Sequence, residues 1–119
     1  MSAPSVPEPS PVNKGDCVPD LLIAELHRLR DKNDYFPVNS AFMEAIDLVK
    51  ARDAFGRSKY GQPLMTQDGR NTLEDAKQEF GDLLQYAYKA QLNGESVKEL
   101  QELVPVLLGI LKLPVSQIP

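Results

Sequence analysis

The sequence has one cysteine, one histidine and no apolar segment long enough to cross a membrane. A single cysteine, Cys17, excludes an intrachain disulfide, which is typical of a protein from a reducing compartment. His27 has no second histidine or cysteine near it, so it does not indicate a metal site. No stretch approaches the ~18 apolar residues of a membrane span, and the start lacks the pattern of a secretory signal. We therefore expect a cytoplasmic protein with no membrane contact.

The sequence also lacks an excess of basic residues. It has 17 acidic and 13 basic side chains, which give a net charge of −4. Non-specific binding to nucleic acid depends on a cationic surface that neutralises phosphates. We therefore expect no nucleic-acid polymer as a partner, whereas a small phosphorylated ligand remains compatible with this charge.

Proline and serine dominate the start of the chain. Residues 1–18 contain no apolar run long enough to bury, so we expect a disordered Pro/Ser-rich tail there. Residues 19–113 are expected to form one all-α domain, followed by a short C-terminal tail over residues 114–119. A core of that size is modest, and small helical chains often complete it by forming oligomers.

Four helices are predicted, and no strand pattern of useful length is present. Helical spacing of apolar residues indicates helices over about 19–31, 40–56, 72–92 and 96–111. Gly56 is expected to end the second helix, and Pro105 to kink or split the fourth. Capping boxes are expected at the starts of the last two helices, in which Thr72 pairs with Asp75 and Ser96 with Glu99.

The second and third helices carry unusual apolar patterns. The second is apolar on two sides and is expected to be central; one side holds Phe42, Ala45, Ile46 and Val49, and the other holds Leu48, Ala51 and Phe55. The third has one apolar stripe within roughly 120° of its circumference, made of Leu73, Ala76, Phe80, Leu83, Leu84, Ala87 and Ala90.

The connection between these two helices, residues 56–71, is longer than most helix–helix connections and contains three glycines. Loops of that length are more often functional than not. The region is also basic. Between residues 50 and 70 the positive side chains are Lys50, Arg52, Arg57, Lys59 and Arg70, against only Asp53 and Asp68.

Three carboxylates share one edge of the third helix. Asp75, Glu79 and Asp82 recur at spacings of four and three. Tyr86 lies on the same edge of the helix, and no lysine is interleaved with the carboxylates there. Like charges in this arrangement repel each other, so a basic side chain or a divalent metal should offset them. A solvated or ion-paired edge is the alternative interpretation.

A second acidic pair lies on the preceding helix. Glu44 and Asp47 are three residues apart, and antiparallel packing of the two helices would bring them toward Glu79 and Asp82. Two carboxylate pairs beside a basic loop suit a metal-chelated polyphosphate. The alternative is that Asp47 is merely exposed.

These residues resemble the MazG-type all-α nucleoside triphosphate pyrophosphohydrolases. The succession of Lys59-Tyr60-Gly61, Asp68-Gly69-Arg70 and Glu79-Phe80-Gly81-Asp82 is similar to that of small members encoded by phages and other viruses. The resemblance covers roughly residues 40–92. The first acidic motif departs from the family pattern, because it is ExxD here and EExxE in the family.

The resemblance implies a four-helix MazG-like bundle that forms a homodimer or homotetramer, in a bacterium or a virus-infected host. It implies Mg²⁺-dependent attack of water on the α-phosphorus of a nucleoside triphosphate, giving the monophosphate and pyrophosphate, with Mn²⁺ as a substitute metal. The implied metal ligands are Glu44, Asp47, Glu79 and Asp82, and Glu44 or Glu79 would act as the base. Substrate contacts are expected from Arg52, Lys59, Tyr60, Arg70, Asn71 and Tyr86.

Two other functions remain open at this point. The chain would serve as a helical protein-interaction module if the acidic edge met a basic partner and an apolar patch stayed exposed. Alternatively, it would bind nucleotides without hydrolysing them. No set of residues in the sequence selects one base or sugar.

Overall fold

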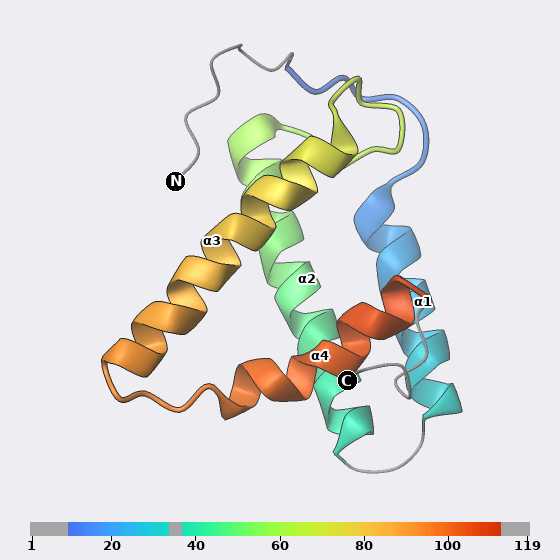
Figure 1. Cartoon of the computed structure of the whole chain (residues 1–119). Helices are drawn as coiled ribbons and strands as arrows, with labels where there is room; N and C mark the ends of the chain where they lie inside the picture. Colours follow the sequence, from blue (N-terminus) through green and yellow to red (C-terminus); the bar gives the residue numbers. More distant parts are fainter. Residues whose placement is uncertain (1–9, 34–36, 113–119) are drawn as a thin grey trace.

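The computed structural model describes residues 10–33 and 37–112, which form four α-helices and no strand (Figure 1). The helices are α1 (Val18–Lys32), α2 (Val38–Tyr60), α3 (Thr72–Leu92) and α4 (Lys98–Ile110). The predicted all-α class is therefore confirmed for this part of the chain. Residues 1–9 of the predicted N-terminal tail, and the whole C-terminal tail predicted over 114–119, lie outside the described residues. None of the described helices is both long and apolar enough to span a bilayer.

The core lies where α2 packs against α1 and α4. Its three most deeply buried large side chains are Leu26 of α1 and Phe42 and Ile46 of α2. Val106 of α4 closes the cluster from the other side. The central position predicted for the second helix is confirmed, but only one of its two apolar sides is buried. Leu48 and Phe55, on the other side, remain about half exposed.

Helix α3 stands apart from this core. It contains no buried residue, and Figure 1 shows it diverging from α2 toward its C-terminal end. Within the predicted apolar stripe, Leu73 is 73% exposed and Leu84 is 56% exposed. The described residues therefore form a three-helix core with an additional, weakly packed helix.

Several predicted helix ends are wrong. Helix α2 continues through Gly56 to Tyr60 and ends at Gly61, which has a left-handed φ of +75° and donates its amide to the Arg57 carbonyl at 2.9 Å. Gly56 keeps helical geometry, and the left-handed glycine that ends the helix is Gly61 instead. Pro105 lies inside a continuous α4 and does not split it.

The predicted capping boxes are also replaced by other contacts. The side chain of Asn71, not that of Thr72, caps α3 by accepting a hydrogen bond from the Glu74 amide at 3.1 Å. At the start of α4, the Ser96 hydroxyl accepts a hydrogen bond from the Lys98 amide at 3.2 Å, whereas the predicted partner was Glu99. Side-chain caps depend on the local path of the backbone, which the spacing alone does not determine.

Residues 10–17, expected to be disordered, run alongside the loop that joins α2 to α3. The Thr66 amide donates to the Asp16 carbonyl at 2.9 Å, and the Gln67 amide donates to the Lys14 carbonyl at 3.0 Å. A single antiparallel bridge pairs Cys17 with Met65. The composition of this segment predicted disorder because it contains no apolar run to bury. The segment is held instead by backbone hydrogen bonds to a loop that is distant in sequence, and backbone pairing leaves no pattern in side-chain composition.

We expect Gly15→Ala to detach this segment from the loop. Gly15 has a φ of +93°, and an added Cβ would overlap the Thr66 hydroxyl and lie 2.9 Å from the Gln67 amide nitrogen. Gly94→Ala is the matched control, because Gly94 also has a positive φ (+72°) but a Cβ there meets open space. In hydrogen exchange, the Thr66 and Gln67 amides should exchange about fivefold faster or more in Gly15→Ala only. Unchanged protection of both amides would contradict the pairing.

Candidate functional site

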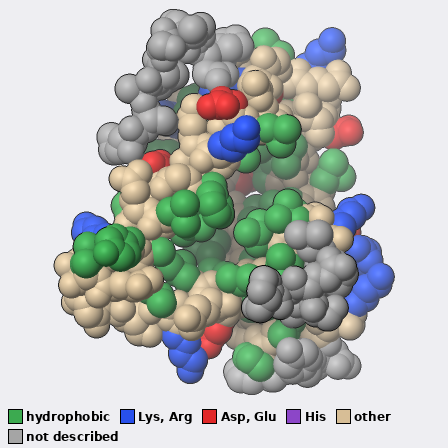
Figure 2. All heavy atoms as spheres, in the orientation of Figure 1, with side chains coloured by type: hydrophobic (Ala, Val, Ile, Leu, Met, Phe, Trp, Pro, Cys, Tyr) green, Lys and Arg blue, Asp and Glu red, His purple; other side chains and the backbone are tan. Residues whose placement is uncertain are grey.

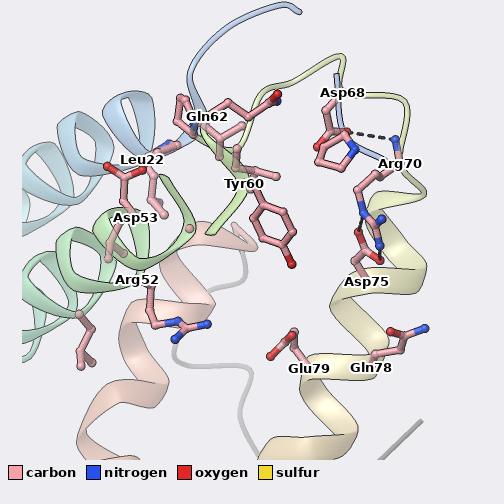
Figure 3. Close-up of a pocket in the computed structure, with 18 residues that line it drawn as sticks. Leu22, Arg52, Asp53, Tyr60, Gln62, Asp68, Arg70, Asp75, Gln78 and Glu79 are labelled. Atoms are coloured by element: carbon pink, nitrogen blue, oxygen red, sulfur yellow. Dashed lines mark hydrogen bonds and ion pairs between the residues drawn. The ribbon is translucent and has the colours of Figure 1, made fainter. Parts of the chain in front are cut away.

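A cavity of about 620 Å³ opens between the α1–α2 pair and the start of α3 (Figure 3). Its floor comes from α1 and α2, and its far wall from α3 and the loop over residues 61–71. The charged residues that line it are Arg52, Asp53, Asp68, Arg70, Asp75 and Glu79. Ligand sites in proteins commonly have this size and this mixture of apolar wall and few polar groups.

One wall of the cavity is fixed by an ion pair between the loop and α3. Arg70 donates to both carboxylate oxygens of Asp75, at 2.9 Å through Nε and 3.0 Å through Nη2. The Arg70 amide also donates to the Asp68 carboxylate at 3.1 Å, and Asp68 is only 5% exposed. Two parallel hydrogen bonds fix the orientation of a guanidinium better than one does.

The pKa of Asp75 lies below its ordinary value. The main cause is the pair of hydrogen bonds from Arg70, which stabilise the charged carboxylate. Asp75 was predicted to be the capping-box partner of Thr72 at the start of α3, and this prediction is wrong. Its side chain reaches back to the loop and positions Arg70 at the cavity wall.

Three polar groups converge from the opposite sides of the cavity. Figure 3 shows Arg52 and Tyr60 of α2 pointing toward Glu79 of α3 across the open space. Arg52 also lies over the Phe55 ring, 4.6 Å from its centroid. Among the described residues, neither Arg52 nor Glu79 forms an ion pair. This guanidinium and this carboxylate are therefore available to a ligand.

Asp53 has a structural partner instead. Its carboxylate accepts from Arg57 Nε at 2.9 Å, one turn along α2. The pKa of Arg57 is raised, chiefly because the Asp53 hydrogen bond favours the charged guanidinium. This pair holds Arg57 beside the start of α1, where its Nη2 lies 3.8 Å from the Asp20 carboxylate.

The four predicted metal ligands do not come together in one copy of the chain. Glu79 lines the cavity, whereas Glu44 and Asp47 lie on exposed positions of α2 outside it. Asp82 is half-buried on α3, one turn beyond Glu79. In the described ranges, no group of three or more acidic, histidine or cysteine side chains is close enough to hold a metal ion.

The predicted substrate residues divide in the same way. Arg52, Tyr60 and Arg70 line the cavity. Lys59 instead lies 5.2 Å from the centroid of the Tyr60 ring, and Asn71 serves as the cap of α3. Tyr86 is 68% exposed and lies outside the cavity.

Two cavity residues were missed by the sequence analysis. Gln62 and Gln78 line the cavity, and neither belongs to an acidic or basic pattern. The Gly61-Gln62-Pro63 sequence was a usable signal for Gln62, because a left-handed glycine before it and a proline after it leave the glutamine little backbone freedom.

We compared the chain with models of protein families, with curated proteins and with solved structures, and none of the three comparisons found a match.

We expect Asp75→Asn to lower the free energy of unfolding by about 0.5–1 kcal/mol at pH 7, since the ion pair is partly exposed. The paired Asp75 has a lowered pKa in the folded state, so its contribution is complete above the ordinary value of 3.8 and disappears as pH falls below it. Glu74→Gln is the control, because Glu74 occupies the same first turn and forms no ion pair with any other described residue. Urea unfolding from pH 7 to pH 3 measures both. A difference that persists unchanged at pH 3 would contradict the assignment.

Proposed function

We propose that the cavity between α2 and α3 binds a nucleoside triphosphate and that the chain hydrolyses it to the monophosphate and pyrophosphate. The observation that carries this proposal is the convergence of Arg52, Tyr60 and Glu79 on one cavity whose wall also presents Arg70 (Figure 3). The reaction itself comes from the resemblance to MazG-type enzymes. We propose that the protein acts in the cytoplasm of a bacterium or an infected host cell, where substrates of this class are present.

The charge of the cavity supports a metal-bound rather than a free triphosphate. Four carboxylates and two guanidinium groups line it, and because Arg57 neutralises Asp53 the charge left on the lining is −1. A bare polyphosphate would be repelled by this surplus of negative charge. Binding therefore requires a divalent cation between the phosphates and the carboxylates, and we propose Mg²⁺, with Mn²⁺ as a substitute.

The donor set fits a magnesium ion that keeps most of its water. Mg²⁺ is commonly held by one or two carboxylates, with water and substrate phosphates completing its octahedron. Glu79 and Asp82 provide two carboxylates on one edge of α3, and Glu79 reaches the cavity. The four-carboxylate arrangement that includes Glu44 and Asp47 is not needed for this mode of binding. Bound Mg²⁺ would polarise the phosphate oxygens and lower the pKa of a coordinated water.

The side chains of the cavity then have distinct roles. Arg52 and Arg70 face the phosphate oxygens from opposite walls and neutralise them. Asp75 acts as a positioning residue, because it orients Arg70 without reaching the substrate. Glu79 orients the attacking water or accepts its proton. The Tyr60 side chain packs beside the sugar.

We further propose that a second copy of the chain covers α3. Figure 2 shows hydrophobic side chains along α3 and across the hollow beside it. Phe80 is 54% exposed and Leu83 43%, although both belong to one continuous apolar stripe. Exposed apolar side chains on a helix with no buried residue support an interface on this face. A homodimer, or a homotetramer built from it, buries the stripe symmetrically.

The dimer makes a testable prediction for the mass in solution. Analytical ultracentrifugation of the wild type should give a multiple of the 13.2 kDa chain mass. Leu84→Lys places a charge in the centre of the stripe and should shift the protein to a monomer. Gln85→Lys, at the next position, which is also exposed but lies outside the stripe, should leave the assembly intact. A wild type that sediments as a monomer would contradict this part of the proposal.

For catalysis, we expect Glu79→Gln to slow pyrophosphate release by about a hundredfold or more, because the amide cannot accept a proton from water or ligate Mg²⁺ as a carboxylate does. Glu74→Gln is the matched control, since it removes one carboxylate from the same helix outside the cavity and should retain full activity. The assay follows pyrophosphate release from a panel of ribo- and deoxyribonucleoside triphosphates with Mg²⁺.

Two outcomes would count against this role of Glu79. The first is equal activity of both variants, and the second is an equal loss in both. Circular dichroism of each variant shows whether a loss reflects unfolding.

The second candidate is a helical interaction module, and two observations favour it. The carboxylates of α2 and α3 are not grouped in one copy, and the apolar stripe of α3 is exposed. A nucleotide-binding protein without hydrolytic activity is a variant of the first candidate. Absence of pyrophosphate release from every triphosphate, with a wild type that remains monomeric and folded, favours the module.

A further inference from the structure

Gln62 holds a polar group that no other part of the described chain satisfies. Its side-chain nitrogen is buried and, among the described residues, has no hydrogen-bond partner. A buried N–H without an acceptor costs free energy, so such groups are rare in native proteins unless they have a function. This nitrogen belongs to a residue that lines the cavity.

The surroundings of Gln62 differ from the charged wall. The lining also includes apolar side chains: Pro63 and Leu64 follow Gln62 in the chain, Leu22 comes from α1, and Leu48 comes from α2. In Figure 3, Gln62 and Leu22 lie on the opposite side of the cavity from Arg70 and Asp75. The cavity therefore has an apolar part beside Gln62 with one unused donor, while its two guanidinium groups, Arg52 and Arg70, lie on opposite walls.

We propose that this apolar part is the base subsite of the cavity, in which the Gln62 amide donates a hydrogen bond to an acceptor on the edge of the nucleobase. This inference rests on the proposed function, because it assigns the part of the cavity that would bind the base of the same nucleoside triphosphate. A nucleobase has flat apolar faces for the aliphatic wall and carbonyl or ring-nitrogen acceptors in its plane. An inorganic polyphosphate would leave both the apolar wall and the amide unused.

The position of Gln62 in the chain supports selectivity. Helix α2 ends at Gly61, whose left-handed φ turns the chain toward the cavity, and Pro63 restricts the backbone immediately after Gln62. A donor held in one place discriminates among ligands better than a donor on a mobile side chain. A site built around such a group rejects ligands that lack the matching acceptor.

The test uses nucleosides without phosphates, so it depends on neither metal nor hydrolysis. The ¹⁵N-labelled full chain is titrated with adenosine, guanosine, cytidine and uridine, and the Gln62 side-chain amide resonances are followed by NMR. We expect saturable shifts of these resonances with at least one nucleoside. Gln62→Leu should raise the dissociation constant for that nucleoside about tenfold or more.

Gln67→Leu is the matched control, because Gln67 is exposed in the same loop and does not line the cavity. Its affinity for the nucleoside should equal that of the wild type. Stability gives a second readout. Gln62→Leu removes an unsatisfied buried donor, so it should be at least as resistant to urea as the wild type, which separates lost binding from lost folding.

The failures of the two proposals can be told apart. The base subsite is overturned if no nucleoside shifts the Gln62 amide, or if Gln62→Leu binds as tightly as the wild type. Pyrophosphate release from triphosphates together with either result would leave the hydrolase proposal standing. Conversely, nucleoside binding that depends on Gln62 without any pyrophosphate release would support the subsite and remove the hydrolytic step.

Discussion

The architecture depends on a constraint within α2, which is apolar on two sides but buries only one of them in its own chain. Phe42 and Ile46 pack under α1 and α4, and this contact supplies most of the core. Leu48, on the other side, lines the cavity that separates α2 from α3. The apolar stripe of α3 consequently packs against no core residue in the described part of the chain. The cavity and the exposed stripe are thus two results of the same incomplete packing.

The loop between α2 and α3 is held at both of its edges. On one edge it pairs with residues 10–17 through backbone hydrogen bonds, and on the other the Arg70–Asp75 ion pair joins it to α3. This ion pair joins the end of the loop to the first turn of α3, and Glu79 follows one turn later on the same helix. Binding a ligand in the cavity would add a further connection between α2 and α3.

The sequence predicted the helices well because each has a periodic apolar side that requires no distant information. Four of the residues that it singled out, Arg52, Tyr60, Arg70 and Glu79, line the cavity, because a basic loop followed by an acidic helical edge is a local pattern. It failed for Asp75 and for residues 10–17. In both cases the partner depends on how the chain folds back on itself, and no spacing rule contains that information.

The predicted pairing of Glu44 and Asp47 with Glu79 and Asp82 rested on a further assumption, that α2 and α3 pack closely side by side. The two helices diverge in the structure, so their carboxylates stay apart within one copy (Figure 1). Helix spacing predicts which residues share a face, but not whether that face meets its neighbour. Gln62 was missed for a related reason, because a buried amide without a partner is visible only in three dimensions.

The most direct test of the central claim is the fate of water oxygen during hydrolysis. The wild-type protein, Mg²⁺ and a panel of nucleoside triphosphates are incubated in ¹⁸O-labelled water, and the products are identified by ³¹P NMR and mass spectrometry. Attack at the α-phosphorus predicts pyrophosphate without label and a nucleoside monophosphate that carries one ¹⁸O atom. Label in orthophosphate or pyrophosphate, or no Mg²⁺-dependent product from any triphosphate, would contradict the proposed reaction.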